Sequence, residues 1–309
     1  MSHVEIFKKA WELATLRPYK KLLWYGFVPA FFTTILSTVA YSFRGYQYWL
    51  ELVAGGDVRI TILSFLQGSW AFLSANPAIF VALILVGVLF AVSYMLLPVF
   101  CHGGLVRLIL DVLQNKEVKF RVGFVYGSKY FLSLFEYKAL FQPFRTTWPF
   151  MTYWAIHTFS PELMSIMIYP IGVWFVISLI ASVLFVFSEY YIILEDTPVL
   201  ASIGKSIRAV FLNLEQVLYI ILLLILIGAR VIFNTLIVFG IPALIIIATG
   251  FFASSVLATI AIISAIVLGI ILLGVLAYIN AIITVFITAA WELIFFEYNK
   301  SKEEPEETT

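Results

Sequence analysis

The chain has 309 residues, of which 62% are hydrophobic and 12% charged. Soluble domains carry about 25% charged residues, so this composition excludes an ordinary soluble protein, whose surface it could not cover. The formal net charge of +1 gives no reason to expect a nucleic-acid partner. A single cysteine, Cys101, excludes an internal disulfide and a cysteine-based metal site.

Residues 1–21 form the first predicted element, an N-terminal amphipathic helix. Ser2 and Glu5 have the spacing of a capping box, apolar residues recur along one helical face, and Pro18 ends the helix. We expect this helix to lie on the membrane surface with its apolar face in the headgroup region. The alternative is a helix packed on the protein's own loops.

The following apolar runs are long enough to cross a bilayer, since about 20 apolar residues do so. They predict an all-α integral membrane protein, a bundle with about six transmembrane helices over residues 22–298. The predicted spans lie near 22–42, 77–98, 146–163 (the weakest), 165–188, 214–238 and 254–290.

Two arrangements of six spans remain open. In the first, residues 146–163 cross the bilayer and residues 214–296 form two long helices. In the second, 146–163 stays on the surface and 214–296 crosses three times. The first arrangement places Lys205 and Arg208 inside the cell and therefore obeys the positive-inside rule better.

Basic residues set the expected orientation. The N-terminal segment carries five, the basic stretch 102–145 carries seven, and the loop 43–76 carries two. The first two regions should therefore face the cytoplasm, with both termini cytoplasmic and the protein in the cell membrane. The acidic tail, 299–309, is predicted to be disordered.

Three stretches carry a family resemblance: Leu23-Trp24-Tyr25-Gly26-Phe27, then Gly103-Gly104-Leu105-Val106-Arg107 with Gly123-Phe124, then Tyr191-Ile192-Ile193-Leu194-Glu195-Asp196 with Lys205-Ser206. Together they resemble bacterial polytopic proteins that include the glycerophosphoryl diester phosphodiesterase membrane domain and its stand-alone relatives of unknown function. The resemblance implies a six-helix bundle with the Arg107 and Lys205 segments on the cytoplasmic side. No counterpart of the soluble phosphodiesterase domain is present, so the resemblance implies no enzyme activity.

Polar residues inside the apolar runs are candidate functional positions, because an ionisable side chain is costly within a bilayer. Arg230 would lie about 24 Å along its helix, near the far interface, with Asn234 one turn onward. This pair could contact a substrate or anion, or Arg230 could be an interface anchor. Glu189 could pair with Arg230 only at equal depth, and Arg107 is a further interfacial position.

Asn280 is expected to form a hydrogen bond across helices, and small residues such as Ala277 and Ala281 let helices approach. Glu292 and Glu297 close the last apolar run, where we expect them to be solvated or paired with loop arginines. The glycines of Gly103-Gly104 are predicted to break the helix before an amphipathic cytoplasmic helix.

The leading hypothesis is a non-enzymatic membrane protein that interacts with lipid or scaffolds a partner. Lys116, Lys119 and Arg121 are candidate contacts to anionic lipid headgroups, unless they only set topology. The second hypothesis is a small-molecule or ion transporter or channel with a polar cavity near Arg230 and Asn280. We predict no catalytic residue, metal ligand or cofactor.

Overall fold

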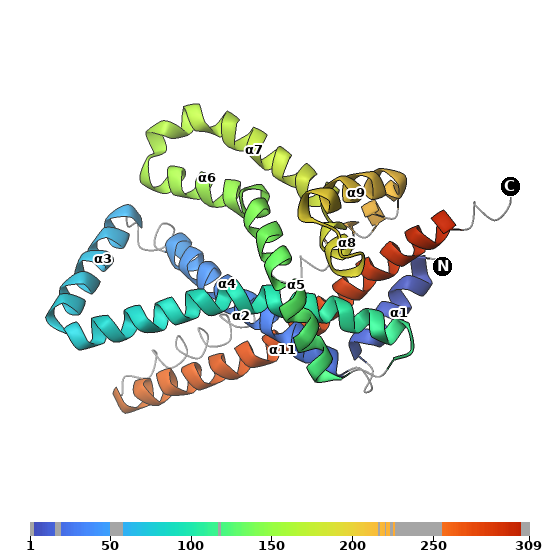
Figure 1. Ribbon diagram of the computed structural model, residues 1–309. Helices are drawn as coiled ribbons and strands as arrows, with labels where there is room; N and C mark the ends of the chain where they lie inside the picture. The colour runs from blue at the N-terminus through green and yellow to red at the C-terminus, as the bar shows by residue number, and fades with distance from the viewer. Residues whose placement is uncertain are drawn as a thin grey trace. The chain divides into compact units, whose positions relative to one another are not determined.

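A computed structural model describes residues 3–15, 20–49, 58–116, 119–215, 217–219, 221–222, 225 and 255–303. Regular structure within these ranges is entirely helical, as the sequence predicts. The helices are α1 (His3–Thr15), α2 (Lys20–Trp49), α3 (Val58–Ala75), α4 (Pro77–Leu113), α5 (Phe120–Phe141), η3 (Gln142–Phe144), α6 (Thr147–Phe159), η4 (Pro161–Leu163), α7 (Met164–Leu184), α8 (Ser188–Leu194), α9 (Val199–Leu212) and α11 (Ser255–Glu303) (Figure 1).

Four stretches in the described part of the chain are long and apolar enough to cross a membrane: Lys20–Val39, Pro77–Leu113, Pro161–Leu194 and Ile266–Asn299. They coincide with four of the six predicted spans.

The other two predicted spans differ. The predicted span at 214–238 lies mostly outside the described residues. The weak span at 146–163 contains α6, whose 13 residues cover about 20 Å, less than the hydrocarbon core of about 30 Å. By itself, α6 is therefore too short to cross a bilayer.

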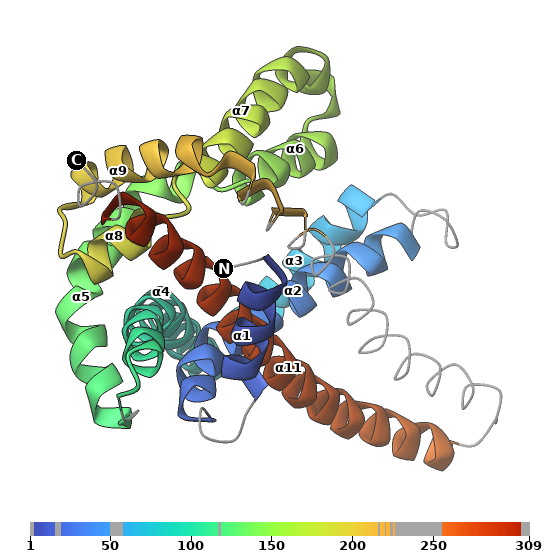
Figure 2. The same ribbon diagram turned by 90° about the vertical axis from the view of Figure 1, so that its right-hand side faces the viewer.

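The chain divides into two compact units. The first comprises residues 1–42, 101–127 and 213–309, and the second comprises 43–100 and 128–212. In the first unit α1 packs against α11 (Figure 2) and buries Ile6, Ala10 and Leu13. Much of the apolar face that the sequence assigns to the membrane surface is therefore covered by another helix of the same chain.

Tyr25 of α2 packs between α4 and α5 within the first unit. Its hydroxyl donates a hydrogen bond to the Phe120 carbonyl oxygen at 2.7 Å. A Cβ atom added at Gly104 would lie 2.9 Å from Cε1 of Tyr25 and 2.5 Å from the Gly123 carbonyl oxygen. Glycine is therefore required at this point of α4, because the backbone of α5 and the ring of Tyr25 both come so close.

The helix break predicted at Gly103-Gly104 is wrong, because α4 is continuous from Pro77 to Leu113. The glycine at position 104 serves close packing between helices rather than a turn. A similar approach joins α2 to α11, where a Cβ on Gly26 would lie 2.8 Å from Cγ2 of Val285 and 3.0 Å from the Ala281 carbonyl oxygen.

In the second unit, α6 and α7 lie side by side (Figures 1 and 2), and α8 packs on α9. Ser206 of α9 connects these pairs. Its hydroxyl donates to the Leu184 carbonyl oxygen at 2.8 Å and accepts from the Phe187 N–H at 3.1 Å. One serine thus satisfies two backbone groups at the end of α7. Backbone groups at a helix end have no hydrogen-bond partner within the helix itself.

The middle of α4 has no covered face. Every residue from 81 to 89 is exposed, and nine consecutive residues go round the helix more than twice at 3.6 residues per turn. Leu85 and Leu89 are 64% and 68% exposed. A helix that is apolar all round belongs in a protein core or in a membrane.

The last helix also differs from the prediction. The disordered tail was expected from residue 299, but α11 continues to Glu303, and residues 304–309 lie outside the described part. Within 255–303 the helix has no break, which agrees with long helices in the last apolar run.

We expect Gly104→Ala to destabilise the protein by about 1–3 kcal/mol, the usual cost of overpacking, because the new methyl group would meet backbone rather than a flexible side chain. Gly87→Ala is the matched control on the same helix, since a Cβ there has nothing within 4 Å. The apparent Tm in detergent should fall for the first variant only. Equal Tm values would show that the Gly104–Gly123 contact is not tight.

Candidate functional site

The structure describes some of the polar residues that the sequence singles out, and it gives their contacts. Arg230 and Asn234 lie outside the described residues. Asn280 donates its Nδ2–H to Oγ1 of Thr34 at 2.9 Å, a hydrogen bond between α11 and α2 of the kind expected. The carboxylate of Glu189 pairs with Lys138 at 3.7 Å, a contact within the second unit.

A buried charged cluster lies in the first unit where α4 faces α11. It consists of Arg107, Asp111 and Glu292, and we call it the Glu292 cluster. Glu292 is fully buried, at 0% exposure, and Asp111 is 6% exposed. Glu292 interacts electrostatically with Asp111 and with Arg107. Of the two alternatives that the sequence left open for Glu292, solvation is therefore wrong, and the structure contains an electrostatic interaction with Arg107 of the basic stretch without a hydrogen bond to Glu292.

The polar atoms of the Glu292 cluster are incompletely satisfied. Among the described residues, neither carboxylate oxygen of Glu292 nor Nε of Arg107 has a hydrogen-bond partner. The Arg107 guanidinium also lies over the ring of Tyr126, with Cζ 5.0 Å from the centroid. A buried charge without hydrogen bonds is costly, so this cluster is the strongest candidate for a functional polar site.

Sequence reasoning missed Asp111, although a signal was present. Arg107 and Asp111 are four residues apart on one helix and therefore share a face. Their common partner on α11 could not be identified, because the rotation of α11 relative to α4 is not encoded in either helix alone.

The connection from α4 to α5 forms a second candidate site, the basic turn, made of Lys116, Lys119 and Arg121. α4 ends in a Schellman motif, with the Lys116 N–H donating to the Asp111 carbonyl oxygen at 2.8 Å and the Asn115 N–H to that of Val112 at 2.9 Å. Asn115 has the left-handed φ of 57° that this motif requires.

All three basic side chains of this turn are exposed. Between and beside them, Phe120 and Phe124 are 53% and 57% exposed. The basic turn therefore combines cationic groups with exposed aromatic rings.

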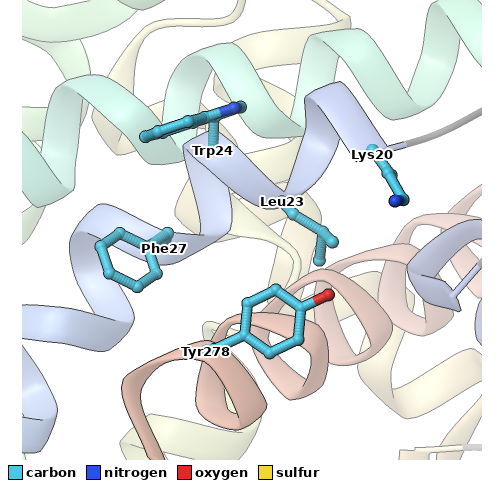
Figure 3. A pocket seen from close by; sticks show the side chains of 5 residues that line it. All are labelled: Lys20, Leu23, Trp24, Phe27 and Tyr278. Atoms are coloured by element: carbon cyan, nitrogen blue, oxygen red, sulfur yellow. The ribbon is translucent and has the colours of Figure 1, made fainter. Parts of the chain in front are cut away.

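A third feature is an open groove between α2 and α11, with a volume of about 330 Å³ (Figure 3). It is lined by Lys20, Leu23, Trp24, Phe27 and Tyr278. The Lys20 ammonium and the Tyr278 hydroxyl lie toward one end of the view, and Phe27 lies toward the other (Figure 3). The groove is thus polar at one end and apolar along the rest.

Two lysines of the second unit are engaged in ion pairs. Nζ of Lys129 lies 2.9 Å from a carboxylate oxygen of Asp196, and Nζ of Lys205 lies 2.6 Å from one of Glu195. Hydrogen bonds to the Tyr130 hydroxyl and to Asp196 raise the pKa of Lys129. The Lys129–Asp196 pair joins the basic stretch to the third sequence stretch quoted above, and the Lys205–Glu195 pair lies within that third stretch. Both fit a structural role.

Groups typical of a metal site are not assembled in the described part of the chain. Cys101 is buried, and no set of three potential metal-ligating His, Cys, Asp or Glu residues comes together there. No family model matches this chain, and neither a curated protein nor a solved structure does. The resemblance noted from the sequence therefore stays a prediction.

We expect Arg107→Met to destabilise the protein by about 3 kcal/mol or more, because removal of one partner leaves a buried charge uncompensated. Adding Glu292→Gln to this variant should restore part of the loss, since the two residues are coupled. Arg208→Met, at an exposed arginine of α9, is the control and should change stability by no more than about 0.5 kcal/mol. The apparent Tm in detergent tests this, and equal losses for the two single arginine variants would contradict it.

Proposed function

We propose that this chain is a polytopic integral membrane protein that interacts with anionic lipid and catalyses no reaction of its own. The observation that carries the proposal is the middle of α4, where residues 81–89 are exposed on every side. Exposing a contiguous apolar surface of this kind to water is unfavourable. Hydrocarbon solvates it, and a helix satisfies its own backbone groups there.

The basic turn supports the lipid part of the proposal. It follows α4, so it begins where the long apolar helix ends. Basic residues together with exposed phenylalanine are typical of segments that lie in the membrane interface, and each basic residue near an anionic surface contributes about 1 kcal/mol to binding. Phe120 and Phe124 beside Lys119 and Arg121 match both patterns.

The triple variant Lys116→Gln, Lys119→Gln and Arg121→Gln should bind anionic surfaces more weakly. Three lost charges at about 1 kcal/mol each correspond to roughly a hundredfold loss at low ionic strength. Capture of protein-containing nanodiscs on phosphatidylglycerol vesicles, compared with phosphatidylcholine vesicles, measures it.

The matched control for this test keeps the charges and changes the side chains: Lys116→Arg, Lys119→Arg and Arg121→Lys. It should bind as the wild type does. Unchanged binding by the glutamine variant would leave these residues with a topological role only.

For the finer topology we propose six spans, with both termini and the α8–α9 region in the cytoplasm. The Lys129–Asp196 ion pair supports this arrangement, because its two residues must lie on the same side of a bilayer. The chain would then cross outward after Lys129, through the rest of α5 together with α6, and return through α7. This route removes the difficulty that α6 is too short by itself.

Cysteine labelling tests this topology in a Cys101→Ala background. Gly204 and Gly68 are suitable positions, because both are exposed and a Cβ at either has nothing within 4 Å. An impermeant maleimide should label Gly204→Cys only in inside-out vesicles and Gly68→Cys in intact cells. Labelling of Gly204→Cys in intact cells would exclude the arrangement.

The second candidate function is transport of an ion or small molecule. The Glu292 cluster favours it, since ionisable groups buried within a candidate span are functional by default. Glu292→Gln is nearly isosteric and separates the two proposals in proteoliposomes. It should abolish solute flux if the chain is a transporter, whereas the lipid proposal expects no flux from the wild type either.

A further inference from the structure

The groove between α2 and α11 has the chemistry of a lipid site. We propose that it binds one anionic phospholipid, with the phosphate at Lys20 and Tyr278 and an acyl chain along Leu23, Trp24 and Phe27. The inference rests on the proposed membrane location and adds a specific site to the lipid interaction, at residues separate from the basic turn.

Charge complementarity selects an anionic occupant. Among the described residues that line the groove, the charged one is the cation Lys20, and the first turn of α2 contains no acidic residue. The N-terminal end of a helix also carries a partial positive charge, and Lys20 is the first residue of α2. The Tyr278 hydroxyl, at the same end of the groove (Figure 3), can donate a hydrogen bond to a phosphate oxygen.

The position of the groove selects a lipid rather than a soluble anion. Lys20 is also the first residue of the candidate span Lys20–Val39, so its ammonium would lie at headgroup level, with the apolar lining extending toward the hydrocarbon. Trp24 is 66% exposed and lies four residues after Lys20, about 6 Å further along α2, where an amphipathic indole ring is typical of the interface. The volume of about 330 Å³ lies at the lower end of the range for small-molecule sites.

Native mass spectrometry of the detergent-purified full chain, titrated with phosphatidylglycerol or phosphatidylcholine, tests the site. The wild type should retain one phosphatidylglycerol in preference to phosphatidylcholine. Lys20→Gln should reduce that preference about fivefold, the effect of one interfacial cation, and Lys20→Arg should keep it. Equal retention of the two lipids by the wild type, or an unchanged preference in Lys20→Gln, would overturn the proposal.

Two further variants keep the test decisive if Lys20→Gln folds poorly. Leu23→Trp should fill the groove and displace the lipid, and Tyr278→Phe should weaken retention while leaving the groove open. Retention unchanged in both would also overturn the site. Displacement of the bound species by inorganic phosphate would assign the groove to a free anion instead of a phospholipid.

The failure of this inference is distinguishable from that of the proposed function. The glutamine variant of the basic turn should keep its groove lipid, because Lys20 and Tyr278 are untouched. Loss of vesicle capture in that variant, with no effect of Lys20→Gln on lipid retention, would leave the proposed function standing and remove the groove site alone.

Discussion

The contact of Tyr25 with two glycines is the constraint on which the first unit depends. Gly104 and Gly123 have no Cβ, so the ring of Tyr25 can lie against the backbone of α4 and α5. Glycine within a helix costs about 1 kcal/mol in conformational entropy, and the hydroxyl bond to Phe120 and the close packing offset it.

This arrangement also places charge inside and hydrocarbon outside. Within the first unit Asp111 and Glu292 are buried with Arg107 beside them, while the middle of α4 in the second unit exposes leucine and valine. In water such a distribution would be unfavourable on both counts. It becomes consistent when the surrounding solvent is lipid, because apolar side chains then belong at the surface and polar groups find partners only inside.

The sequence predicted much of the architecture and little of the site. Apolar runs longer than 20 residues identify α2, α4, α7 and α11, because length and composition are properties of each helix alone. An amide such as Asn280 within an apolar run predicts a cross-helix hydrogen bond for the same reason. Gly104 was misread and the burial of Glu292 was not predicted, since close approach and burial depend on the side chains of a distant helix, which the residue itself does not determine.

The ion pair between Lys129 and Asp196 is weak, but it constrains the topology of the chain. The Lys129–Asp196 pair has side chains 53% and 61% exposed, so it contributes little to stability, typically 0–1 kcal/mol. The pair constrains the topology, because two residues 67 positions apart cannot form an ion pair across a hydrocarbon core about 30 Å thick. The chain between them therefore crosses the bilayer an even number of times or not at all. In the proposed topology, the α6–α7 pair, lying side by side, belongs to a segment that leaves one face of the bilayer and returns to it.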